Sequence, residues 1–147
     1  RVNPVDSPEH AADLEMLADL RYDLVMLPKA ETPANVAGLV GYDVVALIES
    51  ALGLVNANDI ARAPGVFRLA FGVGDFRRDT GASGDPMALA HARSTLVVAS
   101  RVGGLPGPID GPTPGASGEQ LAEACRELGV AVGDRPRDER VLGDGCP

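Results

Sequence analysis

The stretch YDVVALIES, residues 42–50, contains an unbroken apolar run at residues 44–48 that ends directly on Glu49. An apolar run of this length is typical of a strand that is buried on both faces, as the strands of parallel sheets are. A carboxylate at the end of such a strand is a candidate functional group, because the carboxyl ends of parallel strands carry the sites of α/β proteins. This stretch therefore indicates both a fold class and a first site residue.

The same pattern recurs on both sides of this stretch. The predicted strands begin at residues 24, 44 and 66, and spacings of 20 and 22 residues suit one strand and one crossover helix per unit. Helices are expected at residues 7–20, from 32 to about 40, up to about 63, at 86–102 and at 118–128, with a short further strand at 104–110. A glycine-rich loop is expected after the strand that ends at residue 71. The repetition predicts a parallel α/β sheet, either open and doubly wound or closed into a (β/α)₈ barrel.

The composition excludes several classes of protein. With 147 residues, 45% of them hydrophobic, the chain suits one domain with a packed core. A net charge of −8 and the lack of a basic run argue against nucleic-acid binding. No apolar stretch approaches the roughly 18 to 20 residues that span a bilayer, so a soluble protein without membrane contact is expected. Cys125 and Cys146 form neither a disulfide framework nor a zinc motif, which favours a cytoplasmic location.

Side chains of functional type follow each predicted strand. If the strands are parallel, these residues share one end of the sheet. They are Arg1, Asn3, Lys29, Glu49, Asp75 and Asp110.

Glu49 and Asp75 end successive strands and lie 26 residues apart in the sequence, so we expect their carboxylates to converge. Two unpaired carboxylates about 4 Å apart repel by roughly 1 to 4 kcal/mol, and a divalent cation reverses that cost. Mg²⁺ fits this donor set, and no His or Cys accompanies it that would favour zinc. Arg1 would face the same opening and bind a substrate carboxylate. A metal that chelates a keto or hydroxy acid while an enolate forms indicates lyase or aldolase chemistry.

Other charged residues near these strand ends have structural interpretations. Lys29 is expected to pair with Glu31, and residues 77–79 to form an exposed charge cluster. Asp110 is open between a role at the site and a cap on the following turn. No residue is predicted as the catalytic acid or base.

Six segments, in this order, resemble the citrate lyase beta subunit and malyl-CoA lyase branch of the HpcH/HpaI aldolase family. They are RVN, VMLPKAE, ALIESALGLVNANDIA, LAFGVGDFRRDTG, ALAHARSTLVVASRVGG and PIDGPT, and the resemblance runs from residue 1 to about residue 128. It implies a (β/α)₈ TIM barrel of the phosphoenolpyruvate/pyruvate-binding type, Mg²⁺ as cofactor, and assembly as trimers or hexamers. It also implies cleavage or formation of a short hydroxy- or keto-dicarboxylic acid, often as a citryl-CoA, citramalyl-CoA or malyl-CoA type thioester.

The resemblance also implies roles for three residues. Arg1 matches the substrate-binding arginine of the family, Glu49 the glutamate that ligates the metal and contacts the substrate, and Asp75 the metal-ligand aspartate. The first two strands of the family barrel would precede Arg1, and the signature of its last strand is not recognisable after residue 129. The sequence therefore predicts a partial TIM-barrel lyase domain at residues 1–129 and a divergent or disordered tail at 130–147.

Three functional interpretations follow. The first is an Mg²⁺-dependent carbon–carbon lyase, with a thioesterase acting on malyl-CoA-like thioesters as its close relative. The second is a non-catalytic fragment or regulatory subunit that retains the middle of the barrel. The third is an open-sheet ligand-binding domain.

Overall fold

The computed structural model describes residues 1–20 and 22–111. These residues form three strands, β1 (Leu24–Leu27), β2 (Asp43–Ile48) and β3 (Val66–Phe71), together with six helices. The helices are α1 (His10–Asp19), α2 (Pro33–Ala37), α3 (Ala51–Val55), α4 (Ala57–Ala61), α5 (Val73–Thr80) and α6 (Pro86–Val102).

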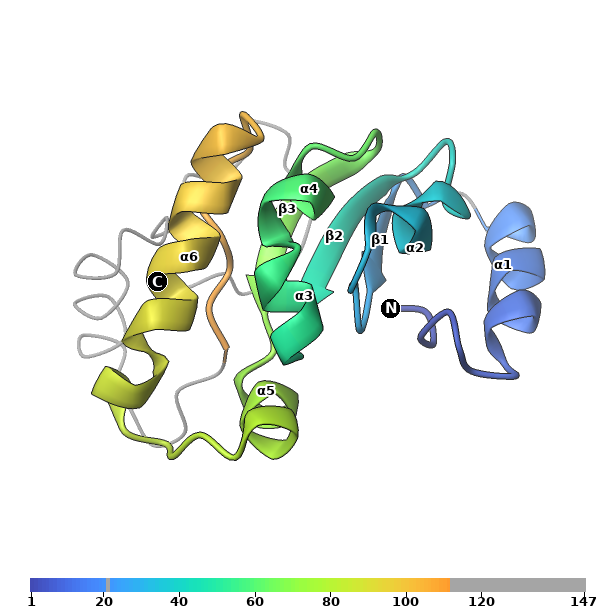
Figure 1. The fold of residues 1–147 in the computed structure, drawn as a ribbon. Coiled ribbons are helices and arrows are strands. Elements are labelled where there is room, and N and C mark those ends of the chain that lie inside the picture. The colour runs from blue at the N-terminus through green and yellow to red at the C-terminus, as the bar shows by residue number, and fades with distance from the viewer. Residues whose placement is uncertain (21, 112–147) are drawn as a thin grey trace, which may run out of the picture.

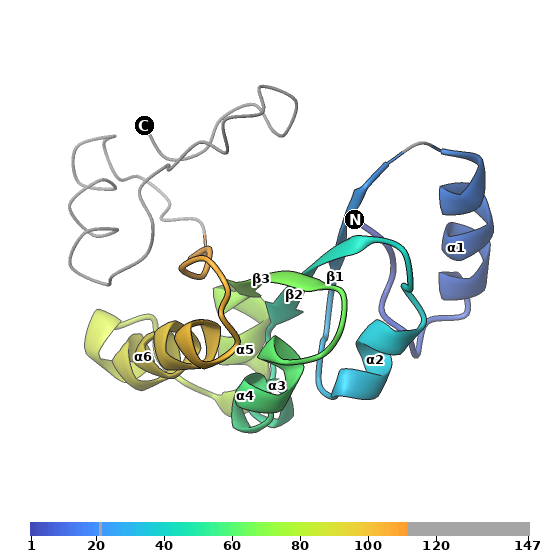
Figure 2. The same ribbon diagram turned by 90° about the horizontal axis from the view of Figure 1, so that it is seen from above.

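The three strands form a parallel sheet in the order β1-β2-β3, so neighbours in the sequence are neighbours in the sheet (Figure 1). At the outer edge of β1, the amide of Val2 donates to the carbonyl oxygen of Met26 at 3.2 Å. Helices α2, α3, α4 and α6 lie on one side of the sheet (Figure 2). The predicted α/β class with a parallel sheet is therefore confirmed, and closure into an eight-stranded barrel stays a prediction.

Instead of the strand predicted at residues 104–110, the structure has a single β-bridge at the outer edge of β3. Ile109 pairs with Ala70 of β3, donating to Leu69 at 3.0 Å and accepting from Phe71 at 2.8 Å. Proline has no amide hydrogen, so the prolines at positions 106 and 108 cannot extend this ladder.

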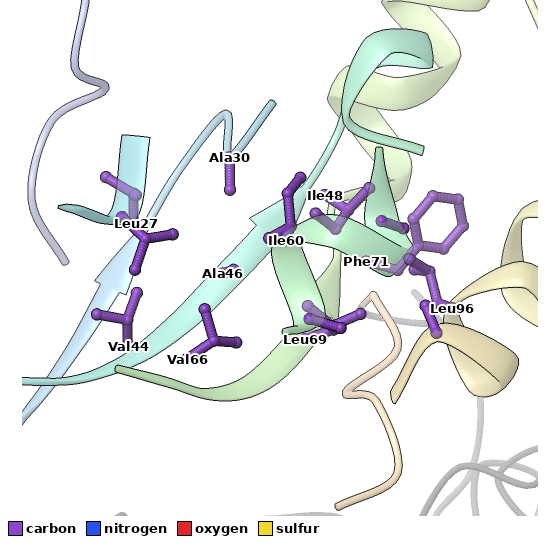
Figure 3. Close-up of a cluster of buried hydrophobic side chains, with 14 of the residues drawn as sticks. Leu27, Ala30, Val44, Ala46, Ile48, Ile60, Val66, Leu69, Phe71 and Leu96 are labelled. Atoms are coloured by element: carbon purple, nitrogen blue, oxygen red, sulfur yellow. The ribbon is translucent and has the colours of Figure 1, made fainter. Parts of the chain in front are cut away.

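The core lies between the sheet and the helices α2, α3, α4 and α6. Leu27, Ala46 and Leu69 align across the three strands and are fully or almost fully buried. Ile60 of α4 and Leu96 of α6 belong to the same apolar cluster (Figure 3). The unbroken apolar runs of the sequence thus correspond to buried strands, as predicted.

The helices differ from prediction in three places. Helix α1 begins at His10 rather than at residue 7, and its N-cap is Glu9, which makes no side-chain capping hydrogen bond. The helix expected up to residue 63 is divided into α3 and α4 at Asn56, whose backbone is not helical. The predicted glycine-rich loop is wrong for residues 73–80, which form α5 and end on Gly81 in the left-handed conformation at φ +73°.

Two predictions concern other parts of the chain. The helix predicted at 118–128 and the tail predicted at 130–147 lie outside the described residues. Within the described ranges, no helix is both long and apolar enough to cross a membrane.

Candidate metal and substrate site

Glu49 and Asp75 follow two adjacent parallel strands. Glu49 comes directly after β2, and Asp75 lies in the first turn of α5, two residues beyond Val73. The amide of Gly72 donates to the carbonyl oxygen of Ile48 at 2.9 Å, so β2 and β3 stay paired up to the site. Asp75 is therefore held by a helix rather than by the loop that the sequence suggested.

The carboxyl group of Glu49 is buried, with 6% of the residue exposed. Its Oε1 accepts a hydrogen bond of 2.9 Å from the backbone amide of Lys29. Lys29 has a left-handed backbone with φ of 47°, which is uncommon for a residue other than glycine. This strained loop residue serves the site through its amide, a role that no side-chain pattern in the sequence indicates.

The electrostatics of Glu49 show which charges lie around it. Burial raises the pKa of the Glu49 carboxyl above its ordinary value, and the carboxylate of Asp75 raises this pKa further. The Lys29 amide and the charge of Arg1 act in the opposite direction on the same pKa. Glu49 and Asp75 thus follow adjacent strands, and Arg1 precedes Val2 at the outer edge of β1. Convergence of the three side chains on one site stays a prediction.

Gly72 leaves the space that Glu49 occupies. A Cβ atom at position 72 would lie 2.5 Å from the Cβ of Glu49 and 2.6 Å from its Oε2, closer than real contacts allow. A Cβ atom at Gly74, two residues further on, would meet nothing within 4 Å. The position of the Glu49 carboxylate therefore depends on the missing side chain at Gly72.

Asp75 forms an ion pair with Arg78 one turn along α5. The side chains are 45% and 79% exposed, and exposed pairs of this kind contribute about 0.2 to 1 kcal/mol. A divalent cation between two carboxylates interacts more strongly than that. The ion pair therefore leaves Asp75 able to ligate a metal.

The interpretation of Lys29 as the partner of Glu31 is wrong. In the described part of the chain no ion pair involves Lys29, and the Glu31 carboxylate instead accepts from the hydroxyl of Ser50 at 2.6 Å. Ser50 also accepts from the amide of Gly53 as the N-cap of α3. A serine before the apolar ALGLV segment is a capping signal in the sequence, but its bond to Glu31 depends on tertiary structure.

The other predicted charges also have defined partners. The Asp110 carboxylate pairs with Nε of Arg93 on α6 at 2.9 Å, and both side chains are about 15% exposed, so Asp110 joins the last described segment to α6. Residues 77–79 are all exposed, as the charge-cluster interpretation expects, and the Asp79 carboxylate in addition accepts from the amide of Ala51 at 2.8 Å, which ties α5 to the start of α3.

The donor set fits Mg²⁺. Among the described residues, no cluster of three or more His, Cys, Asp and Glu side chains is present, so Glu49 and Asp75 are two candidate ligands without a third. Mg²⁺ is commonly held by one or two carboxylates, keeps several waters and completes its coordination with substrate oxygens. The pair of carboxylates, with one of them desolvated, matches that requirement.

Comparison with known proteins adds independent findings. The family model described as HpcH/HpaI aldolase/citrate lyase matches residues 1–107. A citrate lyase subunit beta-like protein of Mycobacterium tuberculosis is 38% identical over 107 residues, covering 68% of this chain and 39% of that protein. A (3S)-malyl-CoA thioesterase of Cereibacter sphaeroides is 32% identical over 111 residues, with 71% and 39% covered. The chain thus spans about two fifths of the length of the curated relatives it matches.

A solved structure is also similar. The crystal structure of the protein CitE of Mycobacterium tuberculosis in complex with magnesium, acetoacetate and coenzyme A superposes with a TM-score of 0.77 at 35% identity. The superposition covers 86% of this chain and 50% of that one. The fold described above is therefore shared with a longer chain whose crystal structure contains magnesium, acetoacetate and coenzyme A.

The close approach of Glu49 to Gly72 predicts that an alanine is harmful at position 72 and harmless at position 74. Gly72→Ala should lower the free energy of unfolding by about 1–3 kcal/mol through overpacking, and it should weaken Mg²⁺ binding because Glu49 must move. Gly74→Ala is the matched control, and the added methyl group should be neutral or stabilising by about 0.4–1 kcal/mol. Urea denaturation and Mg²⁺ calorimetry on both variants measure these effects, and equal results for the two variants would contradict the contact.

The raised pKa of Glu49 predicts how stability depends on pH without metal. The folded chain binds this proton more tightly than the unfolded chain, so the stabilisation is complete below the unfolded pKa and is lost as the pH rises through the folded pKa. Glu49→Gln is neutral at every pH and can still accept from Lys29. In EDTA this variant should unfold a few degrees above the wild type at pH 8 and differ less from it at pH 4.

At pH 8, Mg²⁺ should raise the unfolding midpoint of the wild type above that of Glu49→Gln, which is the reverse of their order in EDTA. A ligand at 100 times its Kd adds about 2.7 kcal/mol to the stability of the protein that binds it, so the wild-type midpoint should rise while that of Glu49→Gln stays unchanged. Thermal unfolding followed by circular dichroism measures both. The same midpoint for the two proteins in EDTA, or the same response to Mg²⁺, is incompatible with a buried carboxylate that ligates the ion.

Proposed function

The chain belongs to the HpcH/HpaI aldolase/citrate lyase family, and we propose that it carries the Mg²⁺ site of a carbon–carbon lyase. The substrate class is a short hydroxy- or keto-dicarboxylic acid held as a CoA thioester of the citryl, citramalyl or malyl type. The observation that supports this proposal is the position of Glu49 and Asp75 just beyond the carboxyl ends of the adjacent parallel strands β2 and β3.

The arrangement of strands supports a barrel as the framework of this site. Spatial order follows chain order from Val2 through β1, β2 and β3 to Ile109, and helices α2, α3, α4 and α6 lie on one side of the sheet. A doubly wound sheet places helices on both sides and reverses its strand order at a switch point. We therefore propose that the described strands are an arc of a (β/α)₈ barrel whose helices are on the outside.

In this proposal each residue has a distinct task. Glu49, whose Oε1 accepts from the amide of Lys29, and Asp75, whose partner in the structure is Arg78, would hold the ion through their carboxylates. Arg1 binds a carboxylate of the substrate through its guanidinium fork. When bound, Mg²⁺ supplies a Lewis acid for the carbonyl oxygen of the keto acid, where enolate charge develops. The burial of Glu49 would strengthen the interaction of its carboxylate with the ion, because charges interact more strongly away from water.

A second candidate is thioester hydrolysis at the same site. The relative named (3S)-malyl-CoA thioesterase, 32% identical over 111 residues, supports it. The products separate the two reactions, because a lyase releases acetyl-CoA from any of the three thioesters, whereas a thioesterase releases free CoA and the intact acid.

Several properties concern the whole protein and stay predictions, because the chain covers 39% of its curated relatives. They are recognition of CoA, assembly as a trimer or hexamer, and a cytoplasmic location. The alternative of a non-catalytic or regulatory subunit that retains the middle of the barrel also stays open to test.

Turnover in the presence of Mg²⁺ tests the proposal. The wild-type chain should form acetyl-CoA from at least one of citryl-CoA, citramalyl-CoA and malyl-CoA, and EDTA should abolish this. Asp75→Asn should lower kcat/KM by at least about 100-fold, equivalent to about 2.7 kcal/mol of transition-state stabilisation, because a metal ligand is lost. The control is Asp59→Asn, which removes an exposed carboxylate of α4 that pairs with Arg62.

The outcomes separate the alternatives. Undiminished turnover by Asp75→Asn would refute the metal site, and free CoA without acetyl-CoA would favour the thioesterase. Mg²⁺ binding without turnover of any of the three thioesters would favour the non-catalytic subunit.

A further inference from the structure

Glu31, in the loop between β1 and α2, has a partner for each of its polar groups. Its amide donates to Oδ1 of Asn35 at 3.0 Å, its carbonyl oxygen accepts from Nδ2 of Asn56 at 2.8 Å, and its carboxylate accepts from Oγ of Ser50 at 2.6 Å. The residue thus joins its own loop to α2, to the α3–α4 junction and to the end of β2. An exposed loop residue would not need three such partners, so this loop has a fixed shape.

Two of the hydrogen bonds close a ring around the candidate metal ligand. Oε1 of Glu49 accepts from the amide of Lys29, and two residues later the carboxylate of Glu31 accepts from Ser50, the neighbour of Glu49. Between them, the amide of Ala30 donates to the carbonyl oxygen of Leu47 at 3.1 Å. Residues 29–31 are therefore fastened to residues 47–50 at three successive points.

The role of Ser50 as the N-cap of α3 leaves its hydroxyl proton free for another acceptor. Oγ of Ser50 accepts from the amide of Gly53 at 3.1 Å, so its one proton is available for a different acceptor, and the Glu31 carboxylate lies at 2.6 Å. A hydrogen bond to an ionised acceptor is roughly twice as strong as a neutral one. A Cβ atom at Gly53 would lie 2.8 Å from the carbonyl oxygen of Ala30, which shows how closely α3 approaches the loop.

From this ring we infer that Glu31 is a positioning residue for the candidate Mg²⁺ site. Through Ser50 it holds the backbone next to Glu49, and through the loop it holds the Lys29 amide on Oε1, so that the Glu49 carboxylate keeps one orientation. This inference rests on the proposed Mg²⁺ site. It adds a residue that does not touch the ion and whose removal acts on metal affinity through Glu49.

Calorimetry with Mg²⁺ alone tests the inference on the 147-residue chain. Glu31→Met keeps the length of the side chain and removes the acceptor, whereas Glu31→Gln keeps an acceptor for Ser50. Loss of an outer partner of a metal ligand typically costs 10–100-fold in metal affinity, so Glu31→Met should raise the Kd for Mg²⁺ about 10-fold or more. Glu31→Gln should stay within about threefold of the wild type, because it restores the hydrogen bond in neutral form.

Two further variants separate positioning from general stability. Val36→Ala removes buried apolar volume from α2, next to the loop, and makes no contact in the ring, so it should lower the unfolding midpoint and leave the Kd unchanged. Ser50→Ala removes the same hydrogen bond from its other end. It should match Glu31→Met in the loss of affinity, and the double variant should lose little more than either single one.

The outcomes distinguish this inference from the function on which it rests. Wild-type affinity in Glu31→Met or in Ser50→Ala overturns the positioning role, as does a Val36→Ala variant that loses as much affinity. If Glu31→Met does not fold, Ser50→Ala and its comparison with Val36→Ala decide the question. A wild-type chain that binds no Mg²⁺ overturns the proposed metal site itself.

Discussion

The hydrogen bond between the Lys29 amide and the buried carboxylate of Glu49 is the interaction on which the site depends. Glu49 is a buried residue with 6% of its surface exposed, and desolvation of its carboxyl group is the largest cause of its raised pKa. One backbone amide and the charge of Arg1 compensate part of this cost, while Asp75 adds to it. In the proposed site, a divalent cation between Glu49 and Asp75 would compensate the rest of this cost.

The surrounding backbone is shaped to keep Glu49 in this position. Gly72 leaves room for its side chain, Lys29 adopts a left-handed conformation beside it, and Asp79 ties α5 to the first residue of α3. Strain and close approach of this kind are expected where geometry serves a site rather than stability alone. The proposed role of Glu31 extends the same arrangement to the loop after β1.

The sequence predicts the strands well and the loops poorly, for physical reasons. Apolar runs report burial directly, so β1 and β3 begin and end where the pattern indicates, and β2 begins one residue earlier. Arg1, Glu49 and Asp75 could be selected because parallel topology brings strand ends to one edge of the sheet. The structure places Glu49 and Asp75 just beyond β2 and β3. Their roles as substrate and metal ligands stay predictions. Helix α5 was missed because two glycines near its start, at positions 72 and 74, resemble a turn, and the partner of Glu31 was missed because it depends on residues 19 positions away.

The most direct test of the account is the anomalous scattering of Mn²⁺, as a substitute for Mg²⁺, in crystals of this chain. The account predicts one strong peak between the carboxylates of Glu49 and Asp75, with Oε1 of Glu49 still on the Lys29 amide and Arg78 released from Asp75. A map with no peak at these two residues, or with the ion bound by other residues, would contradict the central claim that the ends of β2 and β3 form a metal site.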